Sequence, residues 1–86
     1  MNDITVKKLT FMNRDYERVK ESTTFLSGRI SRFKNTCDTF KLSPHNPIVL
    51  ELDGLIAQYK TLTEHIGKVG QALQKTESEI LIDNEN

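Results

Sequence analysis

The sequence predicts an all-α protein, an antiparallel two-helix hairpin of the coiled-coil type. Apolar residues recur at alternating steps of three and four residues in two long segments. A repeat with this period of 3.5 residues is typical of helices that pack along a narrow apolar seam. The segment Ser43-Pro44-His45-Asn46-Pro47 separates the two repeats, and a short turn between two helices makes them antiparallel neighbours. A chain of 86 residues is enough for one small domain.

The first residues of the chain carry no clear helical repeat. Ile4 and Val6 alternate as in a strand, but Leu9 and Phe11 interrupt this alternation. We therefore expect residues 1–12 to form a loose N-terminal arm or a frayed extra turn. The second helix is expected to be the longer one, so Val6 and Leu9 are placed to cover its end.

The first helix is predicted over about residues 14–41. Asn13 or Asp15 begins it, since either side chain can accept hydrogen bonds from the free N–H groups of the first turn. Gly28 weakens this helix by about 1 kcal/mol relative to alanine. The predicted seam positions of this helix are Tyr16, Val19, Thr23, Leu26, Ile30, Phe33, Cys37 and Phe40.

The predicted turn, residues 42–46, is the clearest local signal in the chain. Pro44 disfavours a helical conformation at Ser43, because the proline ring crowds the preceding residue. Asn46 suits the N-cap of the next helix, and Pro47 suits its first position, where the N–H that proline lacks has no helical partner. The residues predicted to set the turn are therefore Pro44, Asn46 and Pro47.

The second helix is predicted over about residues 47–82, which completes a hairpin of residues 13–82. Residues 83–86 contain no apolar side chain, and we expect them to form a solvated polar tail. The seam positions of this helix again alternate in steps of three and four. They are Ile48, Leu52, Leu55, Tyr59, Leu62, Ile66, Val69, Leu73, Thr76 and Ile80.

Several apolar residues fall outside the predicted seam. Scattered exposed apolar side chains are normal on soluble proteins. The alternative interpretation is a second packing surface for another subunit or a partner protein, because these residues flank a seam that is already in use. This candidate partner surface consists of Phe25, Val49, Leu50, Ile56, Leu81 and Ile82.

Three glycines within the second helix allow two interpretations. Gly54, Gly67 and Gly70 each weaken an isolated helix by about 1 kcal/mol relative to alanine. They are either neutral substitutions at solvent-facing positions or places where a neighbouring helix comes close.

The residues able to carry chemistry are isolated in the sequence. His45 and His65 have no second histidine or cysteine at metal-ligand spacing. Cys37 falls in the seam and has no base beside it, so we expect a buried thiol that packs as a small apolar group. We therefore predict no catalytic or metal site, no cofactor and no small-molecule substrate, and a protein that is not an enzyme.

Composition excludes further classes of function. Lys and Arg together number 12, as do Asp and Glu, so the chain lacks the basic excess that argues for nucleic-acid binding. It contains no run of 18 apolar residues, which argues against membrane insertion. No apolar run follows Lys7 and Lys8, so we predict synthesis in the cytoplasm and, if the protein is exported, a route that reads no cleaved signal.

The turn and its flanks resemble a known family. Phe40-Lys41-Leu42-Ser43-Pro44-His45-Asn46-Pro47, followed by Leu50, is similar to the turn of bacterial type III secretion needle subunits. The resemblance covers about residues 33–82, and only the turn is specific. It implies a helical hairpin that is exported without a cleaved signal and polymerises into a hollow tube. The residues that match the family's turn are Pro44, Asn46 and Pro47, and those implied in packing are Leu50, Leu62, Ile80, Leu81 and Ile82.

The sequence thus predicts a structural or interaction protein of a secretion apparatus, acting through self-association or a protein partner. One alternative is a partner-binding module that does not polymerise, such as a secretion chaperone or a type VII WXG100-like secreted protein. Size and the pattern of Leu52, Leu55, Tyr59 and Leu62 resemble the latter class, although its Trp-x-Gly turn is missing. A further alternative is a small nucleic-acid-binding or regulatory hairpin.

Overall fold

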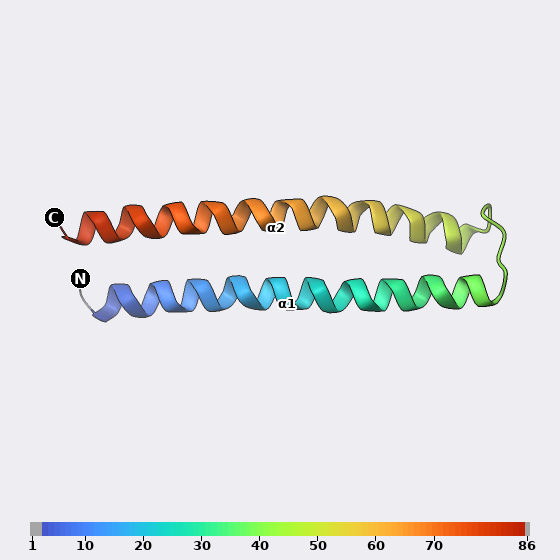
Figure 1. The fold of residues 1–86 in the computed structure, drawn as a ribbon, viewed down its shortest axis with the longest axis horizontal. Coiled ribbons are helices and arrows are strands. Elements are labelled where there is room, and N and C mark those ends of the chain that lie inside the picture. Colours follow the sequence, from blue (N-terminus) through green and yellow to red (C-terminus); the bar gives the residue numbers. More distant parts are fainter. Residues whose placement is uncertain (1–2, 86) are drawn as a thin grey trace.

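The chain folds into two long antiparallel helices. The computed structural model describes residues 3–85, with α1 over Asp3–Thr39 and α2 over Pro47–Glu85. The helices lie side by side, with the turn at one end of the rod and both chain ends at the other (Figure 1). The rod measures 63 × 17 × 12 Å. Its radius of gyration is 19.3 Å, whereas a compact domain of this length has one of about 12 Å. The predicted all-α hairpin is confirmed.

The two ends of the hairpin differ from the prediction. Residues 3–12 belong to α1 and do not form an arm, because no proline or glycine interrupts them and Leu9 extends the column of contact positions. Asn13 and Asp15 therefore lie within α1 and do not begin it. Residues 83–85 continue α2, and the helices have nearly equal lengths of 37 and 39 residues, so α2 has no long overhang. Met1, Asn2 and Asn86 of the predicted arm and tail lie outside the described residues.

The turn is built from two helix caps. Lys41 has a positive φ of 53°, its N–H donates to the Asp38 carbonyl, and the Leu42 N–H donates to the Cys37 carbonyl. This pair of bonds is the Schellman arrangement, in which the residue after the helix adopts the left-handed conformation. Leu42 completes it by packing against the core around Cys37. The predicted end of the first helix at residue 41 is thus shortened to Thr39.

The start of α2 follows the prediction. The Asn46 side chain accepts a hydrogen bond of 2.9 Å from the Ile48 N–H, and Pro47 is the first helical residue. Before it, the Asn46 N–H donates to the Ser43 carbonyl, and the His45 N–H donates to the Ser43 hydroxyl oxygen. These bonds satisfy polar groups that the helix ends leave free.

The contact between the helices is thin. Among the described side chains, the buried apolar ones are Ile30, Cys37 and Leu52, with Ile56 and Tyr59 packed against them. This core lies toward the turn. None of the described side chains is completely buried, as expected of two helices without a third element to cover them.

Two tyrosines set the register of the helices. The Tyr16 hydroxyl on α1 donates to the Ile66 carbonyl on α2 at 3.2 Å, and the Tyr59 hydroxyl on α2 donates to the Thr23 carbonyl on α1 at 3.1 Å. Each bond crosses the contact between the helices, one in each direction. They fix how far one helix can slide along the other.

A glycine on α2 makes room for Tyr16. A Cβ atom at Gly70 would overlap the Tyr16 hydroxyl and lie 2.9 Å from its Cζ atom. A helical Cβ points back toward the preceding turn, so a side chain at Gly70 would cover the Ile66 carbonyl that Tyr16 reaches. Of the two interpretations of the glycines, close approach therefore holds at Gly70. Gly54 and Gly67 have open space around the position of a Cβ atom.

The helices meet along columns that differ from part of the predicted seam. Tyr16, Ile30, Leu52, Tyr59, Ile66, Leu73 and Ile80 lie at the contact as buried or half-buried residues. The assignment to the seam was wrong for a second group, whose side chains are exposed. This group comprises the apolar residues Val19, Leu26, Phe33, Phe40, Ile48, Leu55, Leu62 and Val69, together with the polar residue Thr76.

The contact instead uses the neighbouring column of α2, which contains Val49, Ile56, Gly70 and Glu77. Both this column and the predicted one obey the seven-residue spacing, so periodicity alone does not choose between them. The choice follows from the tyrosines, since Tyr16 fits over Gly70.

Candidate protein interaction surface

Eight exposed apolar residues form one continuous feature on the hairpin, which we call the apolar flank. Four come from α1 at seven-residue intervals and four from α2 at the same intervals. A spacing of seven keeps residues on one side of a helix in a coiled-coil packing. The apolar flank consists of Val19, Leu26, Phe33, Phe40, Ile48, Leu55, Leu62 and Val69.

Both halves of the apolar flank lie on the same side of the hairpin. Apart from Ile48, which lies just after the turn, the flank residues come three positions after a contact residue, as Phe33 follows Ile30 and Leu55 follows Leu52. Equal offsets in two antiparallel helices point to the same side of their common plane. A groove confirms this placement near the turn, where Phe33 of α1 lines it together with Ile48 and Leu55 of α2.

The opposite side of the hairpin has a different character. The groove there is lined by Ser27, Ile30, Ser31 and Lys34 of α1 and by Ile56 and Tyr59 of α2. Its apolar members, Ile30, Ile56 and Tyr59, already belong to the core or pack on it, and the remaining α1 residues of the groove are polar. Eight exposed large apolar residues thus gather on one side of the rod. The other exposed large apolar residues in the described part of the chain lie outside the apolar flank, and they are Ile4, Val6, Phe11, Phe25, Leu50 and Ile82.

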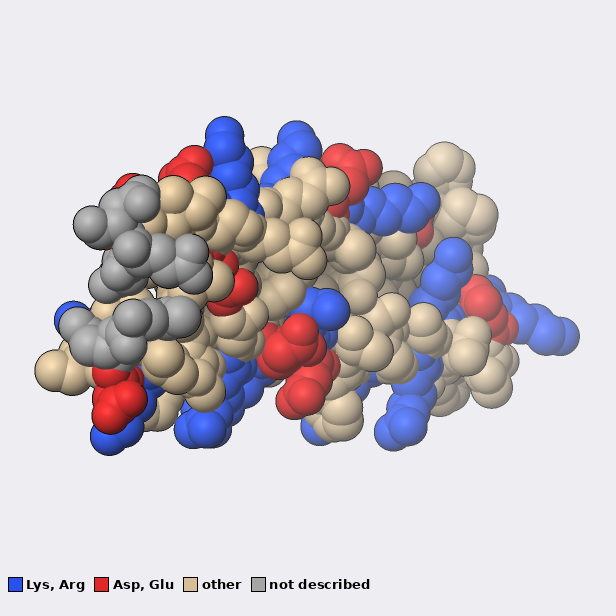
Figure 2. Space-filling model, turned by 60° about the vertical axis from the view of Figure 1, so that its left-hand side comes forward, with Lys and Arg blue, Asp and Glu red and all other residues tan. Residues whose placement is uncertain are grey.

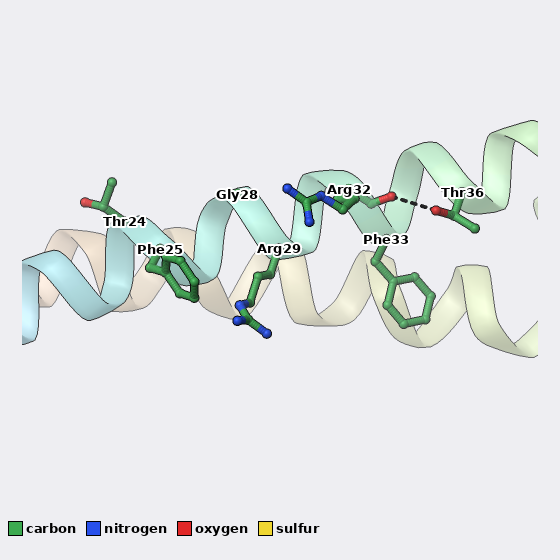
Figure 3. Close-up of a pocket in the computed structure, with 7 residues that line it drawn as sticks. All are labelled: Thr24, Phe25, Gly28, Arg29, Arg32, Phe33 and Thr36. Atoms are coloured by element: carbon green, nitrogen blue, oxygen red, sulfur yellow. Dashed lines mark hydrogen bonds between the residues drawn. The ribbon is translucent and has the colours of Figure 1, made fainter.

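A second shallow groove extends the apolar flank around the outside of α1. Its lining includes Phe25, Gly28, Arg29 and Phe33 (Figure 3). Phe25, Arg29 and Phe33 point to the same side of the helix in this view. The Arg29 guanidinium lies 4.5 Å from the centre of the Phe25 ring, a cation–π contact that leaves the ring exposed.

The charges of the two helices are unequal. Helix α1 carries eight Lys and Arg residues and five Asp and Glu residues, which gives it a net charge of +3. Helix α2 carries three Lys and Arg residues and seven Asp and Glu residues, which gives it a net charge of −4. On the face shown in Figure 2, Lys and Arg side chains are interspersed with Asp and Glu side chains, without a continuous basic stripe. In the sequence, the Lys and Arg residues of α1 are spread along the helix from Lys7 to Lys34.

The six residues of the predicted partner surface do not form one surface. Val49 and Ile56 are half-buried between the helices, and Ile56 packs on the core, so their assignment to an exposed surface was wrong. Leu50 and Ile82 are exposed near opposite ends of α2, on the order of 50 Å apart. Leu81 is half-buried, and Phe25 is exposed beside the apolar flank.

The groups considered for chemistry stay apart. Cys37 is a buried free thiol in the core, and His45 is exposed in the turn. In the described part of the chain, no group of three His, Cys, Asp or Glu side chains is arranged to hold a metal ion. Within the same residues, neither helix has an apolar stretch long enough to cross a membrane.

The periodicity could have revealed the apolar flank but not its exposure. The spacing of seven identifies its members as a heptad column, and the error lay in pairing that column with the other helix.

Comparison with known proteins gave no match among family models, curated proteins or solved structures.

Proposed function

We propose that this chain is a non-enzymatic interaction protein that acts by packing its apolar flank against helices of another protein molecule. The observation that carries the proposal is the collection of eight exposed apolar residues on one side of a rod built from two helices. Contiguous apolar surfaces of this kind mark sites of protein association, whereas single exposed apolar residues do not. Helices packed against the flank would continue its heptad pattern as knobs into holes.

A single flank favours a closed complex of fixed size. The eight residues of the apolar flank lie on one side of the rod, so a single partner covering that side would shield all eight from water. This supports the partner-binding class, which includes secretion chaperones and WXG100-like secreted proteins. The polar lining that Ser27, Ser31 and Lys34 give the opposite groove supports it further.

Photo-crosslinking in cells that make this protein tests the proposal without knowledge of the partner. p-Benzoylphenylalanine replaces Leu62 in the centre of the apolar flank or, as a control, Leu50 on the outside of α2. We expect a defined crosslinked product from position 62 and little product from position 50. Equal yields from both positions, or a product from position 50 alone, would contradict the proposed role of the flank.

A self-assembling needle-like subunit is the second candidate function. The resemblance of Pro44-His45-Asn46-Pro47 to needle subunits supports it, as does the exposure of Ile82, which lies far from the turn. Open-ended growth requires two different surfaces on each subunit, and Ile82 would belong to the second one. Light scattering over about two decades of concentration distinguishes the candidates. A molecular mass that rises without limit, and that no longer rises in Ile82→Asp, favours the needle-like subunit. A constant molecular mass favours the closed complex.

A further inference from the structure

We propose that the partner covering the apolar flank is a second copy of this chain, packed face to face into a four-helix bundle with both turns at the same end. This proposal rests on the proposed function, since it names the occupant of the same surface. It specifies a two-fold axis parallel to the long axis of the rod. Under this axis, α1 of one copy lies against α2 of the other, and all neighbouring helices are antiparallel.

The isolated chain exposes more area than a compact monomer of its mass. The chain exposes 7058 Å², whereas a compact monomer of 9.9 kDa exposes about 5,200 Å². The difference, about 1,900 Å², falls within the area that each subunit buries in permanent dimers. The thin core supports the same conclusion, because two helices enclose little volume and four enclose a complete interior.

The shape of the apolar flank suits a second copy. Phe33 of α1 forms one wall of the groove, and Ile48, Leu52 and Leu55 of α2 form the other. Rotation about an axis along the rod keeps each residue at its own level, so Phe33 of each copy would enter the groove of the other. The surface is therefore complementary to itself, as a two-fold interface requires.

Charge selects this axis over the other face-to-face arrangement. A two-fold axis perpendicular to the rod would place α1 on α1 and α2 on α2, which pairs helices of like net charge. The axis along the rod pairs the +3 helix with the −4 helix. Near Phe33, this axis brings the edge of α1 that carries Arg29 and Arg32 in one copy over the edge of α2 that carries Glu51 in the other copy. Opposite charges at such edges determine which helices pair and in which orientation.

A distance between the two turns tests the arrangement directly. Cys37→Ala removes the native thiol, and His45→Cys places a nitroxide label in the exposed turn. Double electron–electron resonance should give a separation below about 35 Å, because neighbouring helix axes lie 8–10 Å apart. A separation approaching the 63 Å length of the rod would overturn the proposed axis, and the absence of dipolar coupling at high protein concentration would overturn the dimer.

A matched pair of variants links the dimer to the apolar flank. Leu55→Glu places a charge in the flank, and Leu50→Glu makes the same change at an exposed residue outside it. We expect Leu55→Glu to raise the dissociation constant by about 30-fold or more and Leu50→Glu to change it by less than about 3-fold. Equal effects would overturn the assignment of the interface to the flank.

The outcome separates this inference from the proposed function. A purified chain that stays monomeric while position 62 crosslinks to a different protein would overturn the dimer and leave the proposed function intact. Loss of the position-62 product together with a monomeric chain would overturn both.

Discussion

The phenol ring of Tyr16 lies over Gly70 of the facing helix, and its hydroxyl donates a 3.2 Å hydrogen bond to the Ile66 carbonyl one turn earlier. The counterpart across the contact is Tyr59, which reaches the Thr23 carbonyl and shares a groove with the small residue Ser27. In each case a small residue lies four positions after the carbonyl that accepts the bond. The two tyrosines therefore determine both the register of the helices and the column along which they meet.

Substitution of the helical glycines should have opposite effects at two positions. Gly54→Ala should stabilise the hairpin by about 1 kcal/mol, because the position has open space and alanine favours the helix. Gly70→Ala should not be stabilised in this way, because the new Cβ atom overlaps the Tyr16 phenol. We expect its free energy of unfolding to be about 1–3 kcal/mol lower than that of Gly54→Ala. Urea unfolding followed by circular dichroism at one fixed protein concentration measures the difference.

Tyr16→Phe provides the control for this glycine prediction. Removal of the hydroxyl should cost less in the Gly70→Ala background than in the wild-type chain, since it relieves part of the overlap. Additive effects of the two substitutions would show that the tyrosine and the glycine do not interact.

Removal of the Tyr59 hydroxyl tests the second register contact. Tyr59→Phe should lower the free energy of unfolding by about 1 kcal/mol, because the hydroxyl bonds to the Thr23 carbonyl and is partly shielded from water. The same measurement applied to Thr61→Val provides a comparison, since the Thr61 hydroxyl bonds only within its own helix and is exposed. A smaller loss in Tyr59→Phe than in Thr61→Val would contradict the role of Tyr59 in register.

The sequence was sufficient to predict the hairpin and the start of α2. Asn46 and Pro47 act through bonds to their nearest neighbours, so their roles can be derived locally. The beginning of α1 was missed because residues 3–12 have a weak repeat, and their helix is supported by α2, which lies far away in the sequence. Leu9 and Met12 of this segment are half-buried, and directly after it the Asn13 side chain donates to Glu77 across the contact.

The apolar flank illustrates a different limit of sequence analysis. Phe33 and Leu55 have the spacing of seam residues, and no local property distinguishes an inner column from an outer one. The observed pairing depends on the fit of Tyr16 over Gly70 and on the bond from Tyr59 to the Thr23 carbonyl. Such a fit depends on the distance between two helices, which hydrophobic periodicity does not encode.

The cap of α1 offers a stabilising substitution. Lys41 adopts a φ of 53°, a left-handed conformation that costs a residue with a Cβ atom about 1 kcal/mol and costs glycine little. Lys41→Gly should therefore raise the free energy of unfolding by up to about 1 kcal/mol. Lys41→Ala serves as the control, because it removes the same charged side chain and keeps the strained Cβ atom. Equal stability of the two variants would argue against the left-handed conformation of residue 41 at the end of α1.

The corrected contact between the helices predicts different effects at two adjacent residues. Ile56 packs on the core, whereas Leu55 belongs to the apolar flank and is 43% exposed. At concentrations low enough to keep the chain monomeric, Ile56→Ala should cost about 2 kcal/mol of stability, because it leaves a gap beside Ile30 and Leu52. Leu55→Ala should cost less than about 1 kcal/mol under the same conditions, because Leu55 is exposed at the edge of the contact and lies outside the core. Thermal unfolding of dilute samples, with the mass checked by light scattering, measures both effects. If Leu55→Ala were the more damaging change in the monomer, the helices would meet along the column that contains Leu55, and the apolar flank would be part of the hairpin's own contact.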